Sequence, residues 1–234
     1  MLEHLQPERV FYYFEEISKI PRGSGNTAKI AEYCLEFAEK RGLKAVKDNY
    51  GNVVIYANAT KGYENSEPLI LQGHLDMVCE KVADLNIDMQ TQGITLCTDG
   101  ESIWADGTTL GADDGIAIAY ILALLASDDI PHPPIEALLT NDEEMGMIGA
   151  RKLDTSLLKG RRLINIDSEE EGIITVSCAG GVRAYCDLPL NFVQASTDMI
   201  AFKLKISGLL GGHSGLDINK HRKNANILLG RLLQ

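Results

Sequence analysis

The sequence lacks a hydrophobic run long enough to cross a membrane: its longest apolar runs are about ten residues, and a spanning helix needs about 20. It also lacks a charged-then-apolar opening, so we expect no secretory signal. Basic residues are few, since 22 Lys and Arg face 33 Asp and Glu, and the formal charge is −11. An acidic surface repels phosphate backbones and anionic lipid, so we expect neither a nucleic acid nor a membrane as a partner.

The sequence also lacks the cysteine pattern of a disulfide-linked protein. There are five cysteines, an odd number, and none forms a CxxC pair. This usage predicts reduced, mostly buried thiols in a cytoplasmic protein, and it argues against disulfides or a thiolate zinc site. The hydrophobic fraction of 45% and the charged fraction of 24% are those of an ordinary globular protein.

Short apolar runs alternate with helical patterns along the first three quarters of the chain. Helical spacing of apolar residues appears on both sides of Pro21 and again over 111–127. Strand-like runs lie at 44–47, 52–57, 68–72, 135–140 and 163–166. This alternation predicts an α/β fold, with a mainly parallel mixed sheet flanked by helices.

The pattern changes near Gly180. Residues 182–188 and 199–206 alternate in polarity as half-exposed antiparallel strands do, and 219–234 has the spacing of a helix. Two strands and a helix cannot bury a core of their own. We therefore expect residues 1–180 to form most of an α/β domain, and 181–234 to begin a smaller α+β domain that the chain does not complete.

Acidic residues and one histidine recur where an apolar segment meets a loop. These segments are His74-Leu75-Asp76, Asp113-Asp114, Asp142-Glu143-Glu144 and Asp167. Ligands of open α/β sheets bind at the carboxyl ends of the strands. Carboxylates gathered there repel one another unless a cation lies between them, and one histidine among several acids suits zinc, manganese or cobalt.

Each of these segments also has an ordinary structural explanation. His74 alone is more often a satisfied core histidine than a ligand. Asp113 and Asp114 would be favourable in the first turn of a helix, and Asp142-Glu143-Glu144 could be a solvated loop. The four segments share one architectural position, however, which favours a metal site.

The motifs HLD, GADDG, DEEMGMIGA and IDSEEEG occur in an order that resembles the dinuclear zinc peptidases related to aminoacylase and peptidase T. Together with LQGHLDMV, CAGG and LLGGHSG, they most resemble the aminoacyl-histidine dipeptidase branch, also called peptidase D or cytosol non-specific dipeptidase. The similarity extends over essentially the whole chain. Members of that family are about twice as long, so the chain resembles their N-terminal half, and 181–234 would begin a lid and dimerisation domain.

The resemblance implies a role for each matching residue. The metal ligands would be His74, Asp113, Glu144 and Asp167, with Asp113 bridging two divalent ions, zinc above all, with manganese or cobalt as alternatives. Asp76 would orient His74, Glu143 would be the general base, and His213 would polarise the scissile carbonyl across a homodimer. The peptide bond between Asp113 and Asp114 would be cis.

The function implied is that of a cytoplasmic, metal-dependent dipeptidase acting on short peptides such as Xaa-His. A tripeptide aminopeptidase or an N-acyl amino acid deacylase with the same metal centre is an alternative. In the family a fifth ligand is a histidine near the C-terminus, and no residue here matches it. We therefore expect the isolated chain to be inactive, and a catalytically inactive metal-binding fragment remains a third alternative.

Overall fold

The computed structural model describes residues 2, 4–168, 170–178, 180, 185–212 and 217–234. It divides into two compact units, Met1–Ile174 and Thr175–Gln234. Within the described residues, no helix is both long and apolar enough to cross a membrane.

The first unit is built on a mixed sheet, as predicted. Its strands are β1 (Lys44–Lys47), β2 (Val53–Ala57), β3 (Leu69–His74), β6 (Ile135–Thr140) and β7 (Arg162–Asn165). Their spatial order is β1-β2-β6-β3-β7, with β1, β2 and β6 paired antiparallel and β3 paired parallel to both β6 and β7. The carboxyl ends of β3, β6 and β7 therefore meet at one edge of the sheet.

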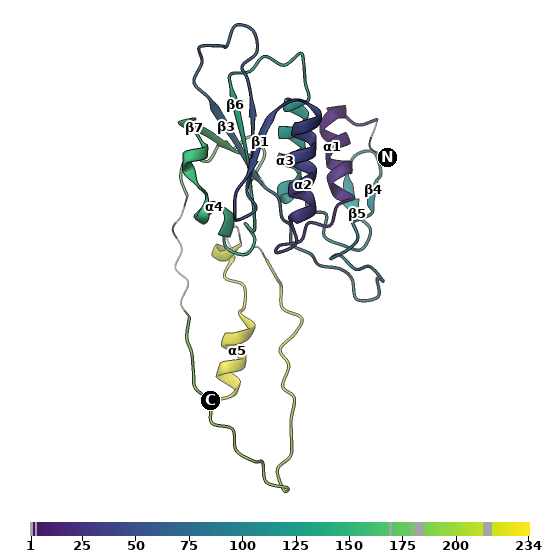
Figure 1. Cartoon of the computed structure of the whole chain (residues 1–234). Helices are drawn as coiled ribbons and strands as arrows, with labels where there is room; N and C mark the ends of the chain where they lie inside the picture. The colour runs from purple at the N-terminus through teal and green to yellow at the C-terminus, as the bar shows by residue number, and fades with distance from the viewer. Residues whose placement is uncertain (1, 3, 169, 179, 181–184, 213–216) are drawn as a thin grey trace. The chain divides into compact units, whose positions relative to one another are not determined.

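Three helices cover one face of this sheet: α1 (Glu8–Ser18), α2 (Ala28–Lys40) and α3 (Ala112–Leu125) (Figure 1). Alternate strand residues such as Ile55, Ala137 and Leu139 join the helices in the main core, whereas Val54, Ile70 and Leu138 form a smaller cluster on the other face. Every residue of β6 is buried, because the strand is central and covered on both faces. This packing fixes the strand ends that carry the acids.

Several short elements were not predicted. A hairpin pairs β4 (Leu96–Thr98) with β5 (Ile103–Ala105), and α4 (Ile148–Lys152) and the 3-10 helix η1 (Thr155–Leu157) lead into β7. These segments span only one or two turns or three strand residues, too few to show a hydrophobic period. The five cysteines are free, as predicted, but only Cys34 is fully buried, and Cys178 and Cys186 are exposed.

The second unit contains the 3-10 helix η2 (Ile218–Lys220) and α5 (Ala225–Leu232), whose Asn224 side chain caps the helix by accepting the amides of Asn226 and Ile227. The predicted strands are absent from described residues 185–188 and 199–206. Their apolar side chains, Phe202 among them at 89% exposure, have no packed face against which a strand could form.

Candidate functional site

His74 is the last residue of β3 and is completely buried. Its Nδ1 lies 3.0 Å from the backbone oxygen of Asp76 and 3.5 Å from Oδ1 of the same residue. Its Nε2 lies 2.9 Å from Asp113 Oδ1 and 3.9 Å from Asp167 Oδ2. Without a cation, a protonated Nε2 can donate to Asp113 Oδ1. When a cation displaces that proton, an Nδ1–H that donates to Asp76 leaves the Nε2 lone pair free for the metal.

Asp113 and Asp114 stand at the start of α3, and the peptide bond between them is cis, as predicted. The two side chains differ in environment: Asp113 is 48% exposed, whereas Asp114 is 1% exposed. Asp114 Oδ2 accepts the His74 backbone N–H at 3.0 Å. Gly73 permits this approach, because a Cβ there would lie 2.8 Å from Asp114 Oδ2.

Glu143 and Glu144 follow β6 in a loop whose position depends on Asp76. The Asp76 carboxylate, 0% exposed, accepts the Glu143 backbone N–H at 2.9 Å on Oδ1 and the Glu144 N–H at 3.3 Å on Oδ2. Its Oδ2 also accepts the Ser24 hydroxyl at 2.7 Å. Asp76 therefore holds both the imidazole of His74 and the backbone of the two glutamates.

The environment changes the acidity of these groups in a consistent way. Burial raises the pKa of Asp114 to about 7, and burial together with neighbouring acids also raises the pKa of Glu143 and of Glu144. Burial opposes protonation of His74, but hydrogen bonds to Asp113 and Asp76 and the charges of the acids outweigh it and raise its pKa to about 11. The cluster thus carries excess negative charge, which a cation would neutralise.

Two groups of side chains have the spacing of a metal site. The ligand atoms of His74, Asp114 and Asp167 lie within 4.8 Å of one another, and so do those of His74, Glu143 and Glu144. One imidazole nitrogen among carboxylate oxygens is a donor set that suits zinc or manganese. The residues present therefore fit a divalent cation.

The structure brings His74, Asp76, Asp113, Glu143, Glu144 and Asp167 together, while His213 lies outside the described residues. The sequence places Asp114 in an acidic segment of the predicted site but gives it no separate role, and it gives none to Ser24 or to the buried Arg22. Arg22 and Ser24 belong to no periodic pattern, and only the folded chain reveals their contacts.

Replacing Asp76 by Asn tests the connection between the histidine and the glutamate loop. An amide keeps the size of the side chain, but its NH2 group cannot accept the amide or hydroxyl donors that the second carboxylate oxygen accepts. We expect cation affinity to fall about 10–100-fold. Competition with a chelating dye measures this, with Asp99→Asn in the exposed turn before β5 as the control; equal affinity in the two variants would contradict the assigned role.

Known proteins resemble this chain over most of its length. No family model matches the chain. The cytosol non-specific dipeptidase of Escherichia coli K12 is 43% identical over 232 residues, which cover 99% of this chain and 48% of that protein. The chain thus spans about half the length of this curated relative.

Solved structures agree with this result. An aminoacylhistidine dipeptidase from Vibrio alginolyticus superposes with a TM-score of 0.73 and 36% identity, over 100% of this chain and 48% of its own. A tripeptidase from Staphylococcus aureus matches with a TM-score of 0.59 and 28% identity, over 70% of this chain and 44% of its own. Along nearly its whole length, the chain is therefore similar to about half of the cytosol non-specific and aminoacylhistidine dipeptidases, which confirms the resemblance in its motifs.

Proposed function

We propose that the protein is a metal-dependent dipeptidase that hydrolyses short peptides with a free amino terminus, Xaa-His among them. The observation that carries this proposal is the group of acids around His74 Nε2, at the edge where three parallel strands end. The 43% identity to a dipeptidase supports the choice of reaction.

His74, Asp113, Glu144 and Asp167 would hold two divalent ions, zinc being the best fit to this donor set, with manganese or cobalt as alternatives. Bound there, the ions would supply the Lewis acidity that activates water and polarises the peptide carbonyl. Asp114, the second acid of the pair, supports this arrangement by accepting the backbone N–H of His74.

Glu143 is the proposed general base. It takes a proton from the attacking water as the new C–O bond forms, and delivers it to the leaving nitrogen as the C–N bond breaks. Burial raises the pKa of Glu143 above its usual value, which helps the carboxyl hold the proton between the two steps. The hydrogen bond from its backbone N–H to Asp76 fixes the loop that carries it.

The remaining parts of the proposal concern the whole protein. His213 would donate to the oxyanion across a homodimer formed through the second unit, and the protein would be cytoplasmic like the relative named for the cytosol. His213→Ala is expected to lower kcat about 10²–10³-fold with metal content unchanged, because one oxyanion donor is lost. Steady-state kinetics and metal analysis of the full-length gene product check this, and a normal kcat would exclude the role.

A substrate panel separates the alternatives. The full-length gene product is assayed on Xaa-His and other dipeptides, tripeptides and N-acyl amino acids, with and without a chelator. Preferred hydrolysis of dipeptides that the chelator abolishes is the expected result. Preference for tripeptides would favour a tripeptide aminopeptidase, preference for N-acyl amino acids a deacylase, and cation binding without any hydrolysis a non-catalytic protein.

A further inference from the structure

A buried arginine lies behind the acids of the candidate site. Arg22 is 2% exposed and donates through Nη1 to the backbone oxygens of Leu75 and Asp76, at 3.1 and 3.2 Å. Its Nη2 donates to the backbone oxygen of Gly111. One guanidinium thus joins the segment at the end of β3, which carries His74 and Asp76, to the segment at the start of α3, where Asp113 and Asp114 have non-helical backbone angles. These two segments are called the two loops below.

The second loop makes room for this guanidinium with two glycines. A Cβ on Gly111 would lie 2.7 Å from Arg22 Nη2, and a Cβ on Gly115 would lie closer than 3.0 Å to the same atom. Gly111 also has a φ of +64°, which side chains disfavour, whereas Gly115 has no positive φ, so its need for glycine lies in the space alone. Gly115 and Arg22 therefore fit one another.

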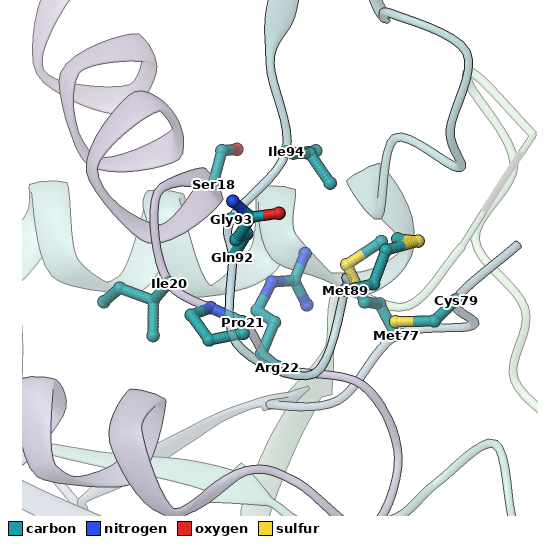
Figure 2. Close-up of a pocket in the computed structure, with 10 residues that line it drawn as sticks. All are labelled: Ser18, Ile20, Pro21, Arg22, Met77, Cys79, Met89, Gln92, Gly93 and Ile94. Atoms are coloured by element: carbon teal, nitrogen blue, oxygen red, sulfur yellow. The ribbon is translucent and has the colours of Figure 1, made fainter. Parts of the chain in front are cut away.

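Neighbouring residues enclose the Arg22 side chain and keep it from solvent. Figure 2 shows its guanidinium among Met77, Met89 and Gly93, which line one pocket with it. Burial lowers the pKa of Arg22 to about 10, and the neighbouring acids oppose that shift, so the group stays charged at neutral pH. A charge held in this way is strongly destabilising unless it makes several hydrogen bonds.

We propose that Arg22 is a positioning residue: its guanidinium fixes the separation of the His74–Asp76 and Gly111–Gly115 loops, and so prepares the metal site before a cation binds. The inference rests on the proposed metal centre. The inference is based on the acceptors of the guanidinium, because its three hydrogen bonds all go to backbone oxygens on the two loops. A planar fork can span such acceptors, whereas the single ammonium of lysine cannot do so with the same geometry.

Two other roles for Arg22 make different predictions. If Arg22 were only a counter-charge for the acids, then removing it would strengthen cation binding, because one repulsive positive charge would be lost. If it were only part of the core, then its loss would destabilise the whole first unit evenly. A positioning role instead predicts weaker cation binding and loosening confined to the two loops.

The experiment compares three variants of the full-length protein. Arg22→Met removes the charge, Arg22→Lys keeps the charge without the fork, and Gly115→Ala keeps Arg22 but inserts a methyl group against Nη2. Arg231→Lys and Gly230→Ala in α5 are the matched controls, because nothing lies within 4 Å of a Cβ at Gly230 and Arg231 is exposed. Zn²⁺ alone is the probe, titrated against a chelating dye, and circular dichroism checks that each variant is folded.

We expect Zn²⁺ affinity to fall about 10–100-fold in all three variants and to remain unchanged in the controls. In the metal-free protein, amide hydrogen exchange should accelerate about tenfold in residues 74–77 and 111–116, as for one lost hydrogen bond, and stay unchanged in β1 and β2. If Arg22→Met does not fold, the other two variants decide the question.

Unchanged affinity in Arg22→Lys and Gly115→Ala would overturn the proposal, as would tighter binding in Arg22→Met or exchange that accelerates evenly through the first unit. Failure of the wild-type protein to bind Zn²⁺ would instead refute the proposed function. In that case the exchange measurement alone would still decide whether Arg22 holds the two loops together.

Discussion

Glu143→Gln is expected to lower kcat about 10²–10⁴-fold, which is the usual contribution of a general base, while metal content stays at the wild-type level. The amide keeps the shape of the side chain and the backbone hydrogen bond to Asp76, but it cannot take up a proton. Steady-state kinetics on the best dipeptide and metal analysis of the same sample provide the measurement.

Two comparisons make this result specific. Glu32→Gln, on the exposed face of α2, removes one carboxylate from the same unit and should leave kcat unchanged. Glu144→Ala should lower metal content as well as turnover, because its carboxylate is the proposed ligand. Loss of metal in Glu143→Gln would show that Glu143 is a ligand. The distances allow this role too, because the ligand atoms of His74, Glu143 and Glu144 lie within 4.8 Å of one another.

His74→Ala is expected to abolish both cation binding and hydrolysis. Its imidazole is the nitrogen donor shared by both groups of candidate ligands, and its removal also takes away the one ion-pair partner that the structure places beside the buried Asp76 within its described residues. We expect the free energy of unfolding of the metal-free protein to fall by about 3–5 kcal/mol, as when one partner of a buried pair is lost. Urea denaturation and metal analysis test the two effects.

The matched control is His132→Ala, in the loop before β6. The ring of His132 contacts the backbone oxygen of Pro133, away from the acids. The variant should therefore bind the cation and hydrolyse dipeptides as the wild type does. A His74→Ala protein that kept wild-type metal content would contradict the assignment of His74 as a ligand.

The main sheet could be predicted from the sequence because its three central strands β2, β6 and β3 are largely apolar and bounded by turns. The predicted bounds of β1 and β6 match the structure, and β3 extends two residues further, to His74. The strands predicted in the second unit are absent from its described residues. Alternating polarity predicts which side chains share a face of a strand, but it does not supply the neighbouring strands or helix that a stable strand needs. The side chains of the predicted strands remain exposed instead.

The site was predictable where its residues end strands, and hidden where they meet only after folding. His74, Glu143 and Asp167 follow apolar runs. Because ligands of open α/β sheets bind at the carboxyl ends of strands, the sequence predicts that these three residues lie close together. Arg22 follows a proline in a loop, and its contact with Gly111 joins residues 89 apart in the sequence. The side-chain pattern alone could not predict that contact.

Anomalous X-ray diffraction from crystals of the full-length protein grown with Zn²⁺ tests the central claim most directly. We expect a peak about 2.0–2.2 Å from His74 Nε2 and from carboxylate oxygens of Asp113 and Asp167, with a second peak beside Asp113 on the side of Glu144. Zinc bound elsewhere, or a His74 imidazole turned away from any metal, would contradict it.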